Sequence, residues 1–228
     1  MTKEALLLTI AVLGGTGKEG KGLAYRWAKA GYRILIGSRS SEKAVKAASE
    51  IMELLEGSSS VVGTTNLEAA GQADIVVLTV PFAAHRETLE SVKDALKGKI
   101  LVDVTAPLVP PKVSKVQMPP AGSAAQQAKE IVGEEVEVVA AFQNISHEHL
   151  FGEENVECDV LVTGTSKKAR AEVLTLVEAA GLTGWDAGPI ENSVVVEGLT
   201  SVLININRMY GSKHSGIKIT GVSKQSTE

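Results

Sequence analysis

The chain has 228 residues, of which 44% are hydrophobic and 22% are charged, and its formal net charge is −4. These are ordinary values for a globular protein, and the length suits one α/β domain or a domain with a smaller annex. The acidic balance argues against a protein that binds nucleic acid through the phosphate backbone, although it permits a local positive pocket for a small anion.

The number of cysteines and the length of the apolar runs indicate in which compartment the protein works and whether it spans a membrane. Cys158 is the only cysteine, which excludes an intrachain disulfide and favours a reducing, cytoplasmic setting. A lone cysteine is more often a buried small side chain than a nucleophile. No apolar run approaches the roughly 20 residues of a membrane span, so we expect no membrane partner.

The first apolar run, LLLTIAVL at 6–13, could be a secretion signal or a buried strand. Lys3 precedes it, but Glu4 lies in what would be the basic region, and a glycine-rich stretch follows in place of a small-residue cleavage site. We interpret the run as a strand.

Similar short apolar runs alternate with amphipathic stretches along most of the chain. Further strands are predicted at 32–38, 60–65, 74–80 and 99–105, and helices at 18–30, 41–55, 66–70 and 83–96. Apolar strands separated by helices are typical of a parallel sheet that is covered on both faces. Because such connections are right-handed crossovers, the pattern predicts a doubly wound, Rossmann-type α/β sheet.

A glycine-rich stretch, GTGKEG at 15–20, follows the first strand and opens the first helix, which is the context that the G-x-G-x-x-G motif requires. We expect Gly15 to allow the tight turn, Gly17 to let a pyrophosphate approach the backbone, and Gly20 to let helix and strand pack closely. Free N–H groups at the helix start would bind the anion. The alternative is a glycine-rich turn without a ligand.

The residues at the end of the second strand indicate whether the site binds NAD or NADP. A site for NAD usually places a carboxylate there for the ribose 2′-hydroxyl. This chain has Ser38 and Arg39 at that position, and Lys43 follows shortly after. A hydroxyl, a guanidinium and an ammonium suit a 2′-phosphate, so the sequence favours NADP(H).

Two further segments are expected at the edge of the sheet where ligands bind. Val80 and Pro81 end the fourth predicted strand, where they could line the dinucleotide or merely form a strand-to-helix turn. The loop at 105–122 holds five of the seven prolines and follows the fifth strand. Loops of this length are often functional, although a plain surface connection is the alternative.

The remaining elements are a helix at 123–132, a strand at 135–141, the polar segment FQNISHEHLF at 142–151, a strand at 158–164, a helix at 167–180 and a strand at 183–188. A long helix at 188–211 closes the fold, with Pro189 near its start and Gly211 at its end. Apolar residues recur along this helix at nearly helical spacing, which suits either core packing or a contact with another surface.

Several segments resemble the NADPH-dependent reductases of the deazaflavin coenzyme F420. They are AVLGGTGKEGKGLAYRWAKAGYRILIGSRSSEKA at 11–44, ADIVVLTVPF at 73–82, LVDVTAPLVP at 101–110, DAGPIENSVVVEGLTSVLININRMYG at 186–211 and GIKITG at 216–221. The resemblance implies an NADP-binding Rossmann-type domain (1–140) and a smaller C-terminal part (141–228) that completes the deazaflavin cleft. It also implies a homodimer and hydride transfer between NADP(H) and F420.

The resemblance also implies which residues bind the two co-substrates. Besides Gly15, the cofactor's phosphates would lie at Thr16, Gly17, Lys18 and Glu19, its 2′-phosphate at Ser38, Arg39 and Lys43, its middle at Val80, Pro81 and Ala84, and the two rings near Gln143 and His147. At Gln143 the chain departs from the archaeal members, which carry a histidine there.

Hydride transfer between two bound rings needs mainly proximity and the exclusion of water, so no catalytic residue and no metal ion are predicted. His147 or His149 could manage a proton at the deazaflavin, although each is more often a packing or surface group. Asp103 could bind a ligand hydroxyl or cap a turn. Arg208 and Lys213 could contact the acidic F420 tail or simply suit the helix end.

Two other functions fit parts of the sequence. One is an NADP-linked reductase of another small substrate, such as an imine or a keto acid, but these enzymes usually carry a large helical C-terminal domain for which there is little room. The other is a redox-sensing regulator without turnover, for which we find neither a basic helix nor a DNA-binding motif.

Overall fold

The computed structural model describes residues 8–57, 60–151 and 156–222. Its strands are β1 (Thr9–Leu13), β2 (Arg33–Ser38), β3 (Val61–Thr65), β4 (Ile75–Leu78), β5 (Ile100–Asp103), β6 (Glu137–Ala140), β7 (Asp159–Gly164) and β8 (Thr183–Pro189). Its α-helices are α1 (Lys18–Lys29), α2 (Ser41–Leu54), α3 (Asn66–Gln72), α4 (Phe82–Val92), α5 (Ala124–Val132), α6 (Lys167–Ala179) and α7 (Ser193–Tyr210). Three short 3-10 helices are η1 (Lys93–Leu96), η2 (His147–His149) and η3 (Ile190–Asn192).

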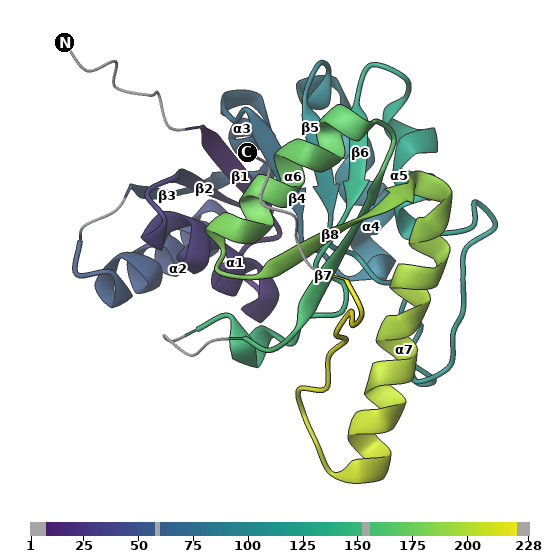
Figure 1. The fold of residues 1–228 in the computed structure, drawn as a ribbon. Helices are drawn as coiled ribbons and strands as arrows, with labels where there is room; N and C mark the ends of the chain where they lie inside the picture. The colour runs from purple at the N-terminus through teal and green to yellow at the C-terminus, as the bar shows by residue number, and fades with distance from the viewer. Residues whose placement is uncertain (1–7, 58–59, 152–155, 223–228) are drawn as a thin grey trace.

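The strands form one sheet in the order β3-β2-β1-β4-β5-β6-β7-β8 (Figure 1). Every neighbouring pair is parallel except β6 and β7, which run antiparallel. The predicted Rossmann-type parallel sheet is therefore confirmed, except that β7 and β8 both run opposite to the other six strands. The chain proceeds from β1 to one side of the sheet through β2 and β3, and then returns to the other side through β4. The switch point where ligands bind in such folds lies between β1 and β4.

Two apolar layers cover the faces of the sheet. Alternate residues of a strand point to opposite faces, so Ile10 and Val12 belong to a core with α1, α2 and α6. Ala11 and Leu13 belong to a second core with α3, α4 and α5. All four side chains are fully buried. This arrangement gives the three layers, helix on sheet on helix, that Figure 1 shows.

The observed elements differ from the predicted ones mainly at their ends. The first strand is described from Thr9, and residues 6 and 7 lie outside the described part of the chain. The long C-terminal helix begins at Ser193 rather than at 188, because Pro189 ends β8 and η3 intervenes. Gly211 ends α7 as predicted, in the left-handed conformation that glycine adopts without strain.

The predicted boundary at residue 140 coincides with the end of β6. Because β7 pairs with β6 through Val139 and Ala140, the C-terminal part extends the same sheet. The division into two domains there stays a prediction. Among the helices that the structure describes, none combines the length and hydropathy that crossing a membrane requires.

Candidate functional site: a cavity at the switch point of the sheet

The loop between β1 and α1 is tighter than the motif alone predicts. Gly14, with φ +68°, adopts the left-handed conformation, and Gly15 follows it inside the same tight turn, as predicted. Gly15 is buried, and a Cβ atom there would lie 2.6 Å from the Val12 carbonyl oxygen. At Gly20 a Cβ atom would lie 2.6 Å from Thr79 Oγ1 and 2.7 Å from the Gly15 Cα. Gly20 therefore permits the close packing that was expected of it.

The start of α1 is open to an anion. Its N-cap is Gly17, and no side chain caps the helix there. The N–H groups of the first turn of a helix lack partners within the helix, and together they favour negative charge. Thr16, Gly17, Lys18 and Glu19 all line the cavity beside this helix end. The loop thus has the geometry of a phosphate site.

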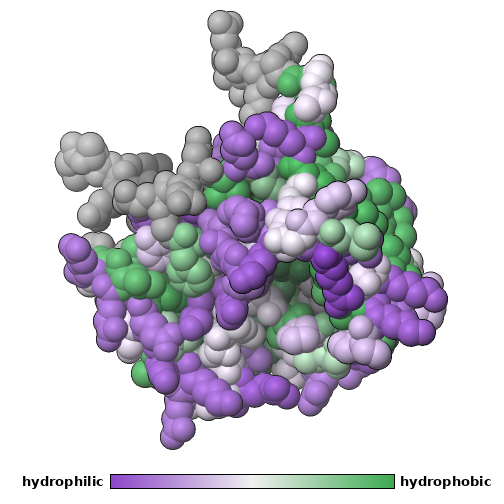
Figure 2. Space-filling view, turned by 90° about the horizontal axis from the view of Figure 1, so that it is seen from below, coloured by the Kyte–Doolittle hydropathy of each residue, from purple (hydrophilic) through white to green (hydrophobic). Residues whose placement is uncertain are grey.

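One cavity of about 850 Å³ connects this loop to the carboxyl ends of the strands. Figure 2 shows the molecule hollowed there, with hydrophilic residues around the rim. Every predicted site residue except Gly15 lines it, namely Thr16, Gly17, Lys18, Glu19, Ser38, Arg39, Lys43, Val80, Pro81, Ala84, Gln143 and His147. The sequence predicted these residues from four separate segments, and the fold brings them to one place.

The cavity has a basic corner at the start of α2. Ser38 is buried at the end of β2, and its Oγ accepts a hydrogen bond of 3.2 Å from the Ser40 N–H. Ser40 in turn caps α2. Arg39 and Lys43 are exposed and line the cavity, and neither forms an ion pair with any other described residue. Their charges are available to a dianionic ligand group.

Gln143 lies at the opposite end of the cavity, and a hydrogen bond fixes the orientation of its side chain. Its Nε2 donates a 2.7 Å hydrogen bond to the Asp103 carbonyl oxygen, and a carbonyl can only accept. Its Oε1 is therefore the free acceptor. That atom is buried and has no partner among the described residues. The Thr200 hydroxyl on α7 donates to the Gln143 carbonyl oxygen at 2.9 Å, which ties the segment to α7.

Asp103 lies beneath this end and does not contact the cavity. Its side chain is fully buried, with Oδ2 2.7 Å from His85 Nε2 and Oδ1 accepting from the Thr105 N–H at 2.9 Å. Of the two roles considered for Asp103, the structure supports the turn cap. Burial by itself lowers the pKa of His85, but the charge and hydrogen bond of Asp103 outweigh it and raise that pKa.

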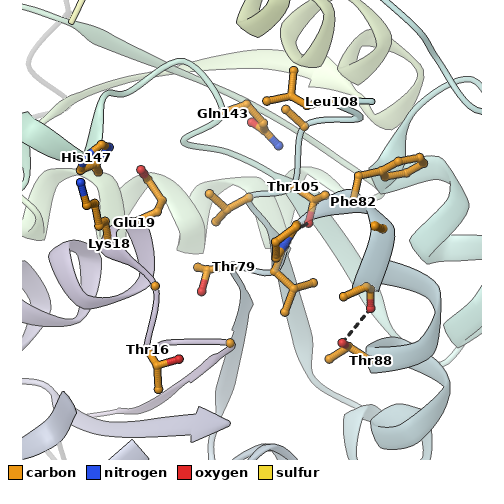
Figure 3. Close-up of a pocket in the computed structure, with 18 of the residues that line it drawn as sticks. Thr16, Lys18, Glu19, Thr79, Phe82, Thr88, Thr105, Leu108, Gln143 and His147 are labelled. Atoms are coloured by element: carbon orange, nitrogen blue, oxygen red, sulfur yellow. Dashed lines mark hydrogen bonds between the residues drawn. The ribbon is translucent and has the colours of Figure 1, made fainter. Parts of the chain in front are cut away.

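Some lining residues were not singled out in the sequence. Figure 3 shows Phe82, Thr88, Thr105 and Leu108 around the cavity, and the Thr88 hydroxyl donates to the Ala84 carbonyl oxygen at 2.8 Å. The proline-rich loop contributes Leu108, so it is a wall of the site, as its position after β5 suggested. Thr200 reaches the cavity from α7, and no local signal in the sequence marks it.

Other candidate residues lie outside the cavity lining. Arg208 is exposed and donates to Ser114 Oγ at 3.3 Å. The His149 ring packs against His214, with ring centroids 5.0 Å apart. Cys158 is buried, and burial raises the pKa of its thiol. Across the described parts of the chain, no group of three or more His, Cys, Asp or Glu side chains is placed to hold a metal ion.

Comparisons with known proteins agree with this geometry. Residues 9–107 match the family described as NADP oxidoreductase, coenzyme F420-dependent. The F420-dependent NADP reductase of Methanocaldococcus jannaschii is 39% identical over 223 residues, which cover 94% of this chain and 99% of the relative. The F420-dependent NADP reductase of Methanothermobacter marburgensis is 40% identical over 222 residues, with the same shares of the two chains.

A crystal structure described as that of a candidate F420-dependent NADP-reductase from Arthrobacter sp. FB24 superposes with a TM-score of 0.80 at 27% identity. The superposition covers 93% of this chain and 99% of that one, so the similarity includes the C-terminal elements as well as the glycine loop. The chain belongs to the family of F420-dependent NADP reductases.

Proposed function

We propose that the protein transfers a hydride between NADP(H) and coenzyme F420. The observation that carries this proposal is the similarity along nearly the whole chain to F420-dependent NADP reductases, because it includes segments at both ends of the cavity. A family match confined to the glycine loop would support only the binding of a dinucleotide. NADP(H) and F420 supply the redox chemistry, and the protein supplies position and a dry site.

The NADP-binding residues that we propose follow the cavity from the open end of α1 to the basic corner. The N–H groups around Thr16 and Gly17 bind the phosphates, and Arg39 and Lys43 bind the 2′-phosphate beside Ser38. Val80, Pro81 and Ala84 contact the middle of the dinucleotide. Unpaired cations and an uncapped helix start support this assignment.

The rings of the two co-substrates occupy the end of the cavity near Gln143 and His147. An acceptor without a partner, such as Gln143 Oε1, suits an N–H donor on a bound ring, because leaving it unpaired in the complex costs about 1–3 kcal/mol. The nicotinamide carboxamide and the pyrimidinedione of a deazaflavin both carry such donors. Hydride transfer then requires the two reacting carbons to lie about 3–3.5 Å apart.

Mixing the purified protein with NADPH and F420 tests the proposal. We expect the absorbance of oxidised F420 to fall and that of NADPH to fall with it, in equal molar amounts. NADPH binding without any loss of F420 absorbance would contradict the activity, and would favour a different substrate or a regulator without turnover.

We also propose that the protein is a homodimer that uses α7. Along this helix Val195, Val202, Ile206 and Met209 are exposed, and their spacing places them in one stripe. Figure 1 shows α7 extending beyond the edge of the sheet. An apolar stripe on a projecting helix is typical of a surface that another chain covers.

Light scattering on the wild-type protein should then give twice the chain mass of 23.9 kDa. Val202→Glu should give a folded monomer, because it places a charge in the stripe without touching the core. Val45→Glu, on the exposed face of α2, is the matched control and should stay dimeric. A monomeric wild type would contradict the proposal.

We place the protein in the cytoplasm, where its single buried cysteine stays reduced. Cell fractionation with an antibody against the chain would test this location.

A further inference from the structure

Glu19 is a carboxyl group inside the cavity, and no described residue pairs with it. It is the second residue of α1, its side chain lines the cavity, and its Oε1 is buried without a hydrogen bond to any described residue. Figure 3 shows the carboxyl group between His147 and Gln143, pointing away from Thr16. A buried acceptor in this position is either a strained feature or a contact for a ligand.

The charged groups around Glu19 leave it unneutralised. Lys18 on its own helix, His147 on η2, and Arg39 and Lys43 at the basic corner line the same cavity, and within the described chain none of them forms an ion pair with it.

The next charged groups on the elements around Glu19 have partners elsewhere. Lys21 on α1 bonds Glu50 at 2.8 Å, Glu148 on η2 lies 3.9 Å from His214, and the His149 ring faces His214. Burial alone raises the pKa of Glu19 to about 8. At neutral pH the group is therefore mostly a neutral acid, with one O–H to donate.

A neutral acid is what the start of α1 requires when an anion binds there. An ionised carboxylate would compete with ligand phosphates for the same helix end and would repel them. A protonated carboxyl can instead donate its O–H to a phosphate or hydroxyl oxygen and accept a bond through its other oxygen.

We propose that Glu19 is a ligand-binding residue that works as a neutral carboxylic acid, so that dinucleotide binding at alkaline pH takes up a proton. The inference rests on the proposed function, since it takes NADP(H) as the ligand. The balance is simple: ionised protein, one proton and the dinucleotide give the protonated complex, and no electrons move. Because the bound anion makes ionisation harder still, the complex holds this proton to higher pH than the free protein does.

Calorimetric titration with NADP⁺ tests the proposal. Each titration is repeated in two buffers with different enthalpies of ionisation, which gives the number of protons taken up. We expect little uptake near pH 7 and about half a proton or more per site near pH 9, with the Kd rising by up to roughly tenfold per pH unit above 8. Glu19→Gln should bind at neutral pH, take up no proton, and keep a nearly constant Kd. Glu130→Gln, an exposed acid on α5 that does not line the cavity, should behave like the wild type.

Infrared difference spectra on NADP⁺ binding near pH 9 provide a second measurement that does not require a variant to fold. Gain of a carboxylic-acid band and loss of a carboxylate band support the proposal. Suppose that NADP⁺ binds at pH 7, but that near pH 9 binding neither takes up a proton nor produces a carboxylic-acid band. That result would overturn the role of Glu19 and leave the proposed function standing. Proton uptake that persists in Glu19→Gln would do the same. No binding at pH 7 would instead overturn the proposed function and this inference together.

Discussion

At the scale of single residues, Arg39 and Lys43 are the exposed cations beside the buried Ser38 hydroxyl. Arg39→Ala should raise the Kd of NADPH by about 10- to 100-fold, since a hydrogen bond to a charged group contributes about 1.5–3 kcal/mol. The Kd of NADH, which lacks the 2′-phosphate, should change by less than about threefold. Titrations that follow the fluorescence of the reduced cofactors would measure both constants.

Arg33 is the matched control for this experiment, because it is an exposed arginine at the other end of the same strand, β2. Arg33→Ala should leave both constants unchanged. Equal weakening of NADPH and NADH in Arg39→Ala would show that Arg39 contacts a part that the two dinucleotides share, and would contradict its place at the 2′-phosphate.

Residues whose role depends on their neighbours in the sequence are easier to predict than residues whose role depends on contacts made only in the folded structure. The glycine loop and Arg39 were predicted because each follows a strand in a recognisable register. The contact between His85 and Asp103 could not be, because the two residues lie 18 positions apart on different elements. Nor does any pattern show that Glu19 lacks a partner, since that depends on everything packed around it.

At the scale of elements, Arg26 connects η2 to α1 and α6 through hydrogen bonds. From α1 it donates to the Leu150 carbonyl oxygen at 2.9 Å, to that of His149 at 2.7 Å and to that of Ala180 at 3.3 Å. His149 is the last residue of η2, and Leu150 and Ala180 are the C-cap residues of η2 and α6. Since η2 includes His147, the position of that side of the cavity depends on an arginine that does not line it.

Arg26→Met keeps much of the apolar stem and removes the three donors. We expect the free energy of unfolding to fall by about 2 kcal/mol, and the amides of residues 146–151 to exchange faster than the amides of β1. Urea denaturation and hydrogen exchange would measure the two effects. Arg86→Met, at an exposed arginine with only a weak 3.5 Å pair to Glu90, should change neither. Exchange that accelerates evenly across the protein would contradict a local role.

Element order was predictable from the sequence, whereas strand direction and the details of helix starts were not. The run at 158–164 reads as a strand, and it forms β7, but an apolar period carries no information on direction. β7 is antiparallel because the chain from β6 returns through η2 without a crossover helix in the described part. The sequence predicts that the long helix begins at 188 because Pro189 suits a first helical turn, yet the same proline can end a strand.

At the scale of the whole molecule, folding raises the pKa of some titratable side chains and lowers the pKa of others. Glu197 accepts from the Ala124 and Ala125 N–H groups at 2.6 and 3.0 Å, and burial, with the nearby charge of Asp103, raises its pKa to about 8. The pKa values of Glu19 and His85 are also raised. In contrast, the pKa values of exposed carboxyl groups such as Glu50, beside Lys21, are lowered.

These shifts fix the sign of the pH dependence of stability. A raised pKa means that the folded chain holds a proton that the unfolded chain releases, so stability falls as the pH rises from the unfolded value towards the folded one. For both glutamates that window runs from 4.5 to about 8. His85 adds to the same trend, because its contribution is full below its ordinary value of 6.5 and is lost as the pH passes its raised value. The carboxyl groups whose pKa is lowered in the folded chain affect stability only at acidic pH. There, stability decreases as the pH decreases.

We therefore expect the urea midpoint of the ligand-free protein to be highest near pH 5 and to fall steadily towards pH 8, with each unit of pKa difference contributing about 1.4 kcal/mol. Glu197→Gln should flatten this fall, since an amide stays neutral in both states and its oxygen can still accept from the start of α5. Glu130→Gln should follow the wild-type curve. A wild-type midpoint that rises from pH 5 to pH 8 would mean that the lowered carboxyl groups dominate. If NADP⁺ binding also takes up a proton at Glu19, saturating ligand should make the fall steeper near pH 8 and extend it to higher pH, because a bound anion keeps Glu19 protonated in the folded state while the unfolded chain releases the proton.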